Sequence, residues 1–124
     1  MEINFNSSAI AKADQYYRTL HIDPKQLPII NSLVDLIVEY VPIPERAMKG
    51  FLWRVLKDYQ VKRHMDLSES KNMSPSERTK GLLEIFASLK KALTRVLIDR
   101  DQEPQLDKAI SEAMKFYKEN FADR

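Results

Sequence analysis

The helical character of this chain is set by residues 74–96, which read SPSERTKGLLEIFASLKKALTRV. Ser74, Pro75 and Glu77 match a capping box, in which a serine and a glutamate three residues apart satisfy the free amides at the start of a helix. Beyond this box, apolar side chains return at intervals of four and three residues, at Leu82, Phe86, Leu89, Leu93 and Val96. That spacing places them on one face, so we expect a helix that begins after Ser74 and packs against a neighbour.

Four further segments carry the same helical signature. They run from a cap at Ser7 or Ser8 to about His21, from about Pro28 to Val41, from Pro44 to about Asp66, and from Pro104 to the end of the chain. Prolines separate them, because proline is tolerated in the first turn of a helix but not in its interior. In the second segment, Asn31, Asp35 and Glu39 form one polar stripe on an otherwise apolar helix, which indicates that this helix is largely buried.

The composition agrees with this pattern. The chain has 124 residues, of which 44% are hydrophobic and 31% are charged, as in one ordinary globular domain. It contains no cysteine, which excludes a disulfide framework, and only two glycines, which excludes a glycine-rich phosphate loop. We therefore predict a single all-α domain over residues 1–124, built as a compact bundle or orthogonal array of about five helices.

Two features bear on membranes and location. The most apolar stretch, residues 27–43, contains Asp35 and Glu39 and is too short for a membrane-spanning helix. The first residues, Met1 to Phe5, lack the positive segment and apolar run of a signal peptide. We expect a cytoplasmic protein with no membrane partner.

The sequence contains no convincing catalytic constellation. His21 and His64 stand far apart, without a second ligand at the spacing that a helical metal site requires. Asp99, Asp101 and Glu103 alternate as in a calcium loop, but Pro104 and Ile110 occupy the positions that need glycine and glutamate. We expect no catalytic residue, no metal site and no cofactor. An enzyme that pairs Asp35 and Glu39 with Asp14 or Glu84 around a metal is the third alternative.

Trp53 stands out on the third helix. An apolar stripe on this helix faces the expected core, and it comprises Ala47, Met48, Phe51, Leu52, Val55, Leu56 and Tyr59. Trp53 lies on the opposite side among polar and basic residues, as tryptophan does in interface hot spots. We predict a non-enzymatic binding or adaptor protein whose partner is another protein or a second copy of the chain, and whose binding face comprises Trp53, Lys49, Arg46, Lys57, Gln60 and His64. The structural alternative is that Trp53 belongs to the core, because a long helix contacts neighbours on two sides.

Charge is distributed unevenly along the chain. Residues 46–95 hold 12 lysines and arginines against 5 acids, a local charge of +7, whereas residues 1–45 carry −3 and residues 96–124 carry −2. This positive charge on the central helices therefore predicts a second kind of partner, the phosphate backbone of RNA or DNA. The candidate phosphate contacts are Lys62, Arg63, Lys90, Lys91 and Arg95. The alternative is that the acidic helices at either end of the chain pack beside the basic central helices and neutralise their charge.

Overall fold

The protein is all-α, as the sequence predicts. A computed structural model describes residues 3–22, 24–63 and 74–120. In these ranges the chain forms α1 (Ser7–Arg18), α2 (Leu27–Ile37), α3 (Glu45–Arg63), α4 (Pro75–Thr94), a short 3-10 helix η2 (Arg100–Gln102) and α5 (Glu103–Asn120). No helix in the described ranges is long and apolar enough to cross a membrane.

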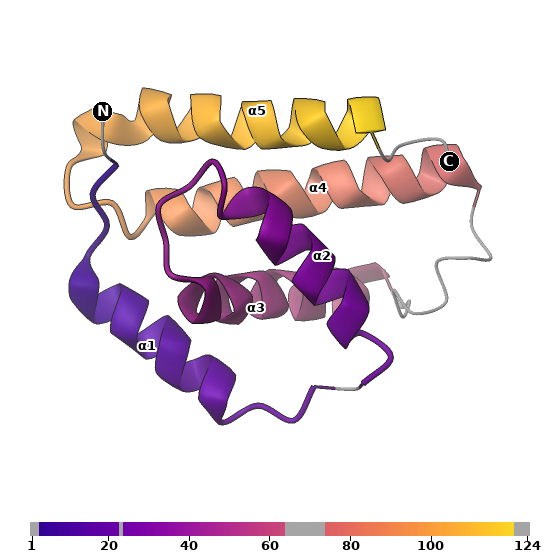
Figure 1. Cartoon of the computed structure of the whole chain (residues 1–124), viewed down its shortest axis with the longest axis horizontal. Coiled ribbons are helices and arrows are strands. Elements are labelled where there is room, and N and C mark those ends of the chain that lie inside the picture. The colour runs from indigo at the N-terminus through magenta and orange to yellow at the C-terminus, as the bar shows by residue number, and fades with distance from the viewer. Residues whose placement is uncertain (1–2, 23, 64–73, 121–124) are drawn as a thin grey trace.

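Three of the helices lie side by side in one layer. α3, α4 and α5 run in alternating directions, as Figure 1 shows, and α4 contacts both of the others. α2 crosses this layer and contacts α3 and α5, while α1 packs against α3. The result is a three-helix layer with α2 and α1 packed onto it, and α3 contacts three of the other four helices.

The core lies between α2 and the layer. α2 supplies a run of buried side chains, at Ile30, Leu33, Val34, Leu36 and Ile37. Asn31 and Asp35 on its polar stripe are exposed. The apolar face of this helix is therefore buried, as predicted, and its polar stripe faces outward. Of the seam predicted for α4, Phe86, Leu89 and Leu93 are each at most 1% exposed, whereas Leu82 and Val96 are half-buried. Removing this apolar surface from water is the main favourable term in folding.

The predicted N-terminal cap is correct for α4 and wrong for α1. The Ser74 hydroxyl accepts a hydrogen bond from the Glu77 amide at 3.2 Å, which confirms the predicted cap of α4. The cap of α1 is Asn6, not Ser7 or Ser8, because the Asn6 side-chain oxygen accepts from the Ala9 amide at 3.1 Å. The two serines then occupy the first turn of the helix.

Two helices end earlier in the chain than the sequence predicted. α1 ends at Arg18, three residues before His21. α2 ends at Ile37, because residues 38–40 form a tight turn in which the Tyr40 amide donates to the Ile37 carbonyl at 3.0 Å. Pro42 accounts only for the non-helical state of Val41, the residue before it, because proline disfavours the helical conformation there. The predicted extension of α3 to Asp66 lies outside the described residues.

The N-terminal segment pairs with the connection between α4 and η2. Phe5 and Leu97 form an isolated antiparallel bridge, and the Asn6 amide donates to the Val96 carbonyl at 2.8 Å. The Asn4 amide also donates to the Gln102 side chain at 2.7 Å. These contacts join residues almost a hundred positions apart, and no local sequence pattern indicated them.

Candidate binding groove

The side of α3 that carries Trp53 is the side on which α1 packs. Gly50 lies against the backbone of Ala13, and the Lys49 ammonium lies 5.5 Å from the centre of the Tyr17 ring. Trp53 follows Lys49 and Gly50 by one helical turn, so it shares their face. Its side chain is half-buried and packs against the core cluster. Trp53 therefore contributes to the packing of the protein itself.

The other residues predicted around Trp53 divide into two groups. Lys49 is engaged within the protein, because it also pairs with Glu45 at 3.3 Å and its side chain is only 17% exposed. Gln60 donates to the Gln26 side chain, just before α2, at 3.1 Å. Arg46 and Lys57 are exposed. His64 lies outside the described residues.

A groove runs along the junction of α3 and α4. It has a volume of about 520 Å³. Its apolar lining comes from both helices and comprises Phe51, Val55, Tyr59, Ala92 and Val96. Its charged lining comprises the cations Arg54, Lys62, Lys91 and Arg95 and the carboxylates Asp58 and Glu84. An apolar floor under a charged rim is the usual anatomy of a protein interface.

The charge in this groove is polarised along its length. Because α3 and α4 run antiparallel (Figure 1), Lys91 and Arg95 near the end of α4 belong to the same end of the groove as Phe51 and Arg54, the earlier residues of the α3 lining. Glu84 lies further back along α4, toward the half that contains Lys62. By chain order, Arg54, Lys91 and Arg95 belong to one end of the lining, whereas Lys62 shares the other end with the carboxylates Asp58 and Glu84.

The basic half continues into a smaller hollow beside α1. This hollow has a volume of about 220 Å³ and shares Phe51, Arg54 and Val96 with the groove. The Arg54 guanidinium lies 4.8 Å from the centre of the Tyr16 ring, a cation–π contact that holds the side chain where the two depressions meet. Lys12 of α1 lines the same hollow and adds another cation.

The groove brings together three of the five predicted phosphate contacts, Lys62, Lys91 and Arg95. Lys90 is not among its lining residues. Its ammonium lies 3.5 Å from the Asp107 carboxylate of α5, so it neutralises an acidic helix, as the alternative use of this charge supposed. The Arg63 side chain lies outside the described part of the structure.

The sequence prediction missed Arg54, Asp58, Glu84 and Ser88, which also line the groove. A signal for them was present. Arg54, Asp58 and Lys62 recur every four residues on α3, and Glu84, Ser88, Lys91 and Arg95 recur at intervals of four, three and four on α4. Such rows mark one face of each helix, but only the packing of α3 on α4 places the two faces on either side of one groove.

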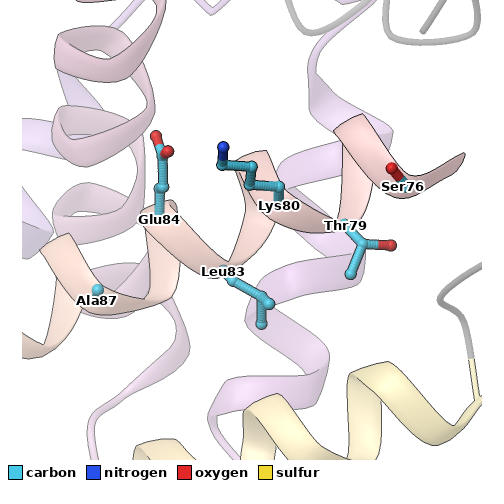
Figure 2. A pocket seen from close by; sticks show the side chains of 6 residues that line it. All are labelled: Ser76, Thr79, Lys80, Leu83, Glu84 and Ala87. Atoms are coloured by element: carbon cyan, nitrogen blue, oxygen red, sulfur yellow. The ribbon is translucent and has the colours of Figure 1, made fainter. Parts of the chain in front are cut away.

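A second depression lies on α4 alone. Ser76, Thr79, Lys80, Leu83, Glu84 and Ala87 line it. Figure 2 shows Lys80 and Glu84 pointing to one side of the helix and Thr79 and Leu83 to the other. It is wide and shallow, because one helix supplies all of its lining. The groove between α3 and α4 has two walls and is the better candidate for a binding site.

The acidic residues considered for a metal site do not form one. Asp35 and Glu39 are exposed. The Asp99 carboxylate accepts a hydrogen bond from the Asp101 amide at 2.9 Å and caps η2. Within residues 3–22, 24–63 and 74–120, no group of three or more metal-ligating side chains comes together.

The chain matches no family model, no curated protein and no solved structure. Its function is therefore inferred from its own residues.

Proposed function

We propose that this chain is a non-enzymatic binding or adaptor protein that receives an anionic segment of another protein in the α3–α4 groove. The observation that carries the proposal is the cluster of Arg54, Lys91 and Arg95 at the rim of an apolar floor. Cations of this kind attract and orient an acidic partner, while burial of apolar surface supplies affinity. The proposal keeps the partner class expected from the sequence and moves the contact surface from Trp53 to the groove.

The face around Trp53 is the competing surface. Arg46 and Lys57 are exposed there, but Trp53 itself is half-buried against the core and Lys49 and Gln60 make contacts within the protein. A hot spot needs a large side chain that the partner can bury. The groove presents the half-buried side chains Phe51, Tyr59, Ala92 and Val96 as an apolar floor, and it has charge on both of its walls.

A second candidate function is binding to the phosphate backbone of a single-stranded nucleic acid. The observation in its favour is that Lys62, Lys91 and Arg95 line one groove together with Arg54. Asp58 and Glu84 stand in the same groove and oppose a phosphate chain. If phosphates bind, affinity should fall steeply with salt, with a logarithmic slope of about 0.7 for each phosphate contacted.

The test is a comparison of three baits in a nuclease-treated extract of the native cell. The baits are the unaltered chain, the groove variant Lys91→Glu/Arg95→Glu, and the control variant Arg46→Glu/Lys57→Glu. All four substituted side chains are exposed and each variant changes the charge equally. We expect a protein that the unaltered chain and the control retain and the groove variant loses. Retention by the groove variant with loss by the control would assign binding to the Trp53 face instead.

A further inference from the structure

We propose that the occupant of the α3–α4 groove is an acidic amphipathic α-helix of about three turns, with its carboxylates concentrated in the half that faces Arg54, Lys91 and Arg95. This inference rests on the proposed function, because it names the partner class for the same site. It is argued from the backbone of the walls, the apolar floor, and the distribution of charge along the groove.

The walls favour a helical occupant over an extended one. Both walls are α-helices, whose backbone amides and carbonyls are already paired along each helix. An extended peptide that binds by strand addition needs an open sheet edge. The lining residues belong to α3, α4 and the turn after α4, so the groove has no such edge. A helix pairs the backbone groups of its interior within itself, so only those of its first and last turns need water or side-chain partners.

The floor fits the apolar stripe of such a helix. Val55 is 7% exposed, while Phe51, Tyr59, Ala92 and Val96 are half-buried and line the groove. On α3 the lining extends from Phe51 to Lys62, which corresponds to about 16 Å at 1.5 Å per residue. A partner helix of about three turns spans that length and presents apolar side chains at every third or fourth position.

The charge pattern selects acidic side chains and sets their position. The half of the groove next to α1 holds Arg54, Lys91 and Arg95, and Lys12 lines the adjoining hollow. In the other half, the lining holds Lys62 together with Asp58 and Glu84, so the net attraction for an anion is weaker there. An amphipathic helix with acids at one end satisfies both halves. A continuous phosphate chain would pass close to the two carboxylates.

Fluorescence anisotropy with labelled probes tests this directly. The main probe is a peptide of about 12 residues, a little over three helical turns, with leucines on one helical face and glutamates beside them toward one end. Three controls accompany it: a scrambled peptide of the same composition, a peptide with lysine in place of glutamate, and an oligothymidylate of about 20 nucleotides. We expect the acidic amphipathic peptide to bind at least about tenfold more tightly than each control. Its circular dichroism should report a gain of helix on binding.

Substitutions then locate the site. Lys91→Glu/Arg95→Glu should weaken peptide binding by about tenfold or more, whereas Arg46→Glu/Lys57→Glu should change it by less than about threefold. Ser88 is exposed and lines the groove, so Ser88→Lys should tighten binding and Ser88→Glu should weaken it. Helicity and melting temperature of each variant confirm that the fold is intact.

The outcomes separate this inference from the function on which it rests. Equal binding of the scrambled peptide, lost in the groove variant, would refute the helical occupant and leave an anion-binding groove in place. Binding of oligothymidylate alone, with the same dependence on Lys91 and Arg95, would assign the groove to nucleic acid. Peptide binding that is unchanged in the groove variant, or no binding of any probe at low salt, would overturn both proposals.

Discussion

Gly50 of α3 lies directly against the backbone of Ala13 of α1, so that a β-carbon on Gly50 would overlap the Ala13 carbonyl oxygen. This close approach allows α1 to pack along the face of α3 that also carries Trp53. Trp53 lies one helical turn after Gly50 on the same face, and its side chain is half-buried against the core. The absent side chain of Gly50 therefore decides which surface of α3 remains available to a partner.

Substitution of Gly50 by alanine should destabilise the protein. Alanine favours a helix by about 0.5–1 kcal/mol over glycine, but the new methyl group would meet backbone atoms that cannot rotate away. Overpacking of this kind typically costs about 1–3 kcal/mol. The measurement is the free energy of unfolding in urea.

Gly81→Ala is the matched control. A β-carbon there would lie 2.5 Å from the Tyr59 hydroxyl oxygen, which is the far end of a side chain and can move. We expect this substitution to change the stability by less than about 1 kcal/mol, because the gain in helix propensity offsets the adjustment of Tyr59. Equal losses at Gly50 and Gly81 would contradict the role assigned to the α1–α3 contact.

Truncation of Trp53 to alanine should lower stability more than it lowers binding. A fully buried aromatic side chain contributes about 3–5 kcal/mol, and the half-buried Trp53 should contribute a substantial part of that. Because the fold remains, peptide affinity per folded molecule should stay within about twofold of the original value. Chemical denaturation and anisotropy measure the two effects. A stable Trp53→Ala variant that no longer binds the peptide would show that the binding site is the Trp53 face.

Leu89→Ala should produce a large loss of stability from the core of the helical layer. Leu89 is fully buried in α4, and leucine-to-alanine substitutions at such positions cost about 2–5 kcal/mol. Val61 of α3 is 68% exposed, so Val61→Ala should change stability by no more than about 0.5 kcal/mol. Thermal melts followed by circular dichroism compare the two variants.

Ser74→Ala should destabilise the start of α4. The Ser74 hydroxyl accepts the Glu77 amide, and loss of such a cap costs about 1 kcal/mol. Ser76 lies two positions further on, is exposed and makes no part of this cap. Ser76→Ala is therefore the control, and it should leave the unfolding free energy almost unchanged. A larger loss at Ser76 than at Ser74 would show that the cap is not the source of the effect.

Most of the fold could be predicted from local chemistry. The prolines, the Ser74 cap and the four-and-three spacing of apolar residues located the helices, because each signal acts within a few residues. The errors lie at helix ends, where Asn6 caps α1 in place of the two serines and a turn over residues 38–40 follows the end of α2 at Ile37. The bridge between Phe5 and Leu97 could not be predicted, since it depends on where the helices bring the chain.

The candidate site was predictable only in part. Lys62, Lys91 and Arg95 were identified from charge, but Lys90 belongs to a contact with Asp107 on another helix. Adjacent lysines on a helix point about 100° apart, so one faces the groove and the other faces α5. No count of charges along the chain could assign Lys90 and Lys91 to different surfaces without the position of α5.

The sequence by itself determined that this chain is helical, where its helices lie, and which face of each helix is apolar, because these properties follow from side-chain chemistry repeated at the helical period. The tertiary structure decided which polar faces remain open. α1 packs on the Trp53 face through the close contact of Gly50 with Ala13, whereas the antiparallel packing of α3 and α4 leaves a basic groove between them. The covering of the Trp53 face and the formation of the groove both depend on contacts between segments distant in sequence, which local periodicity cannot predict.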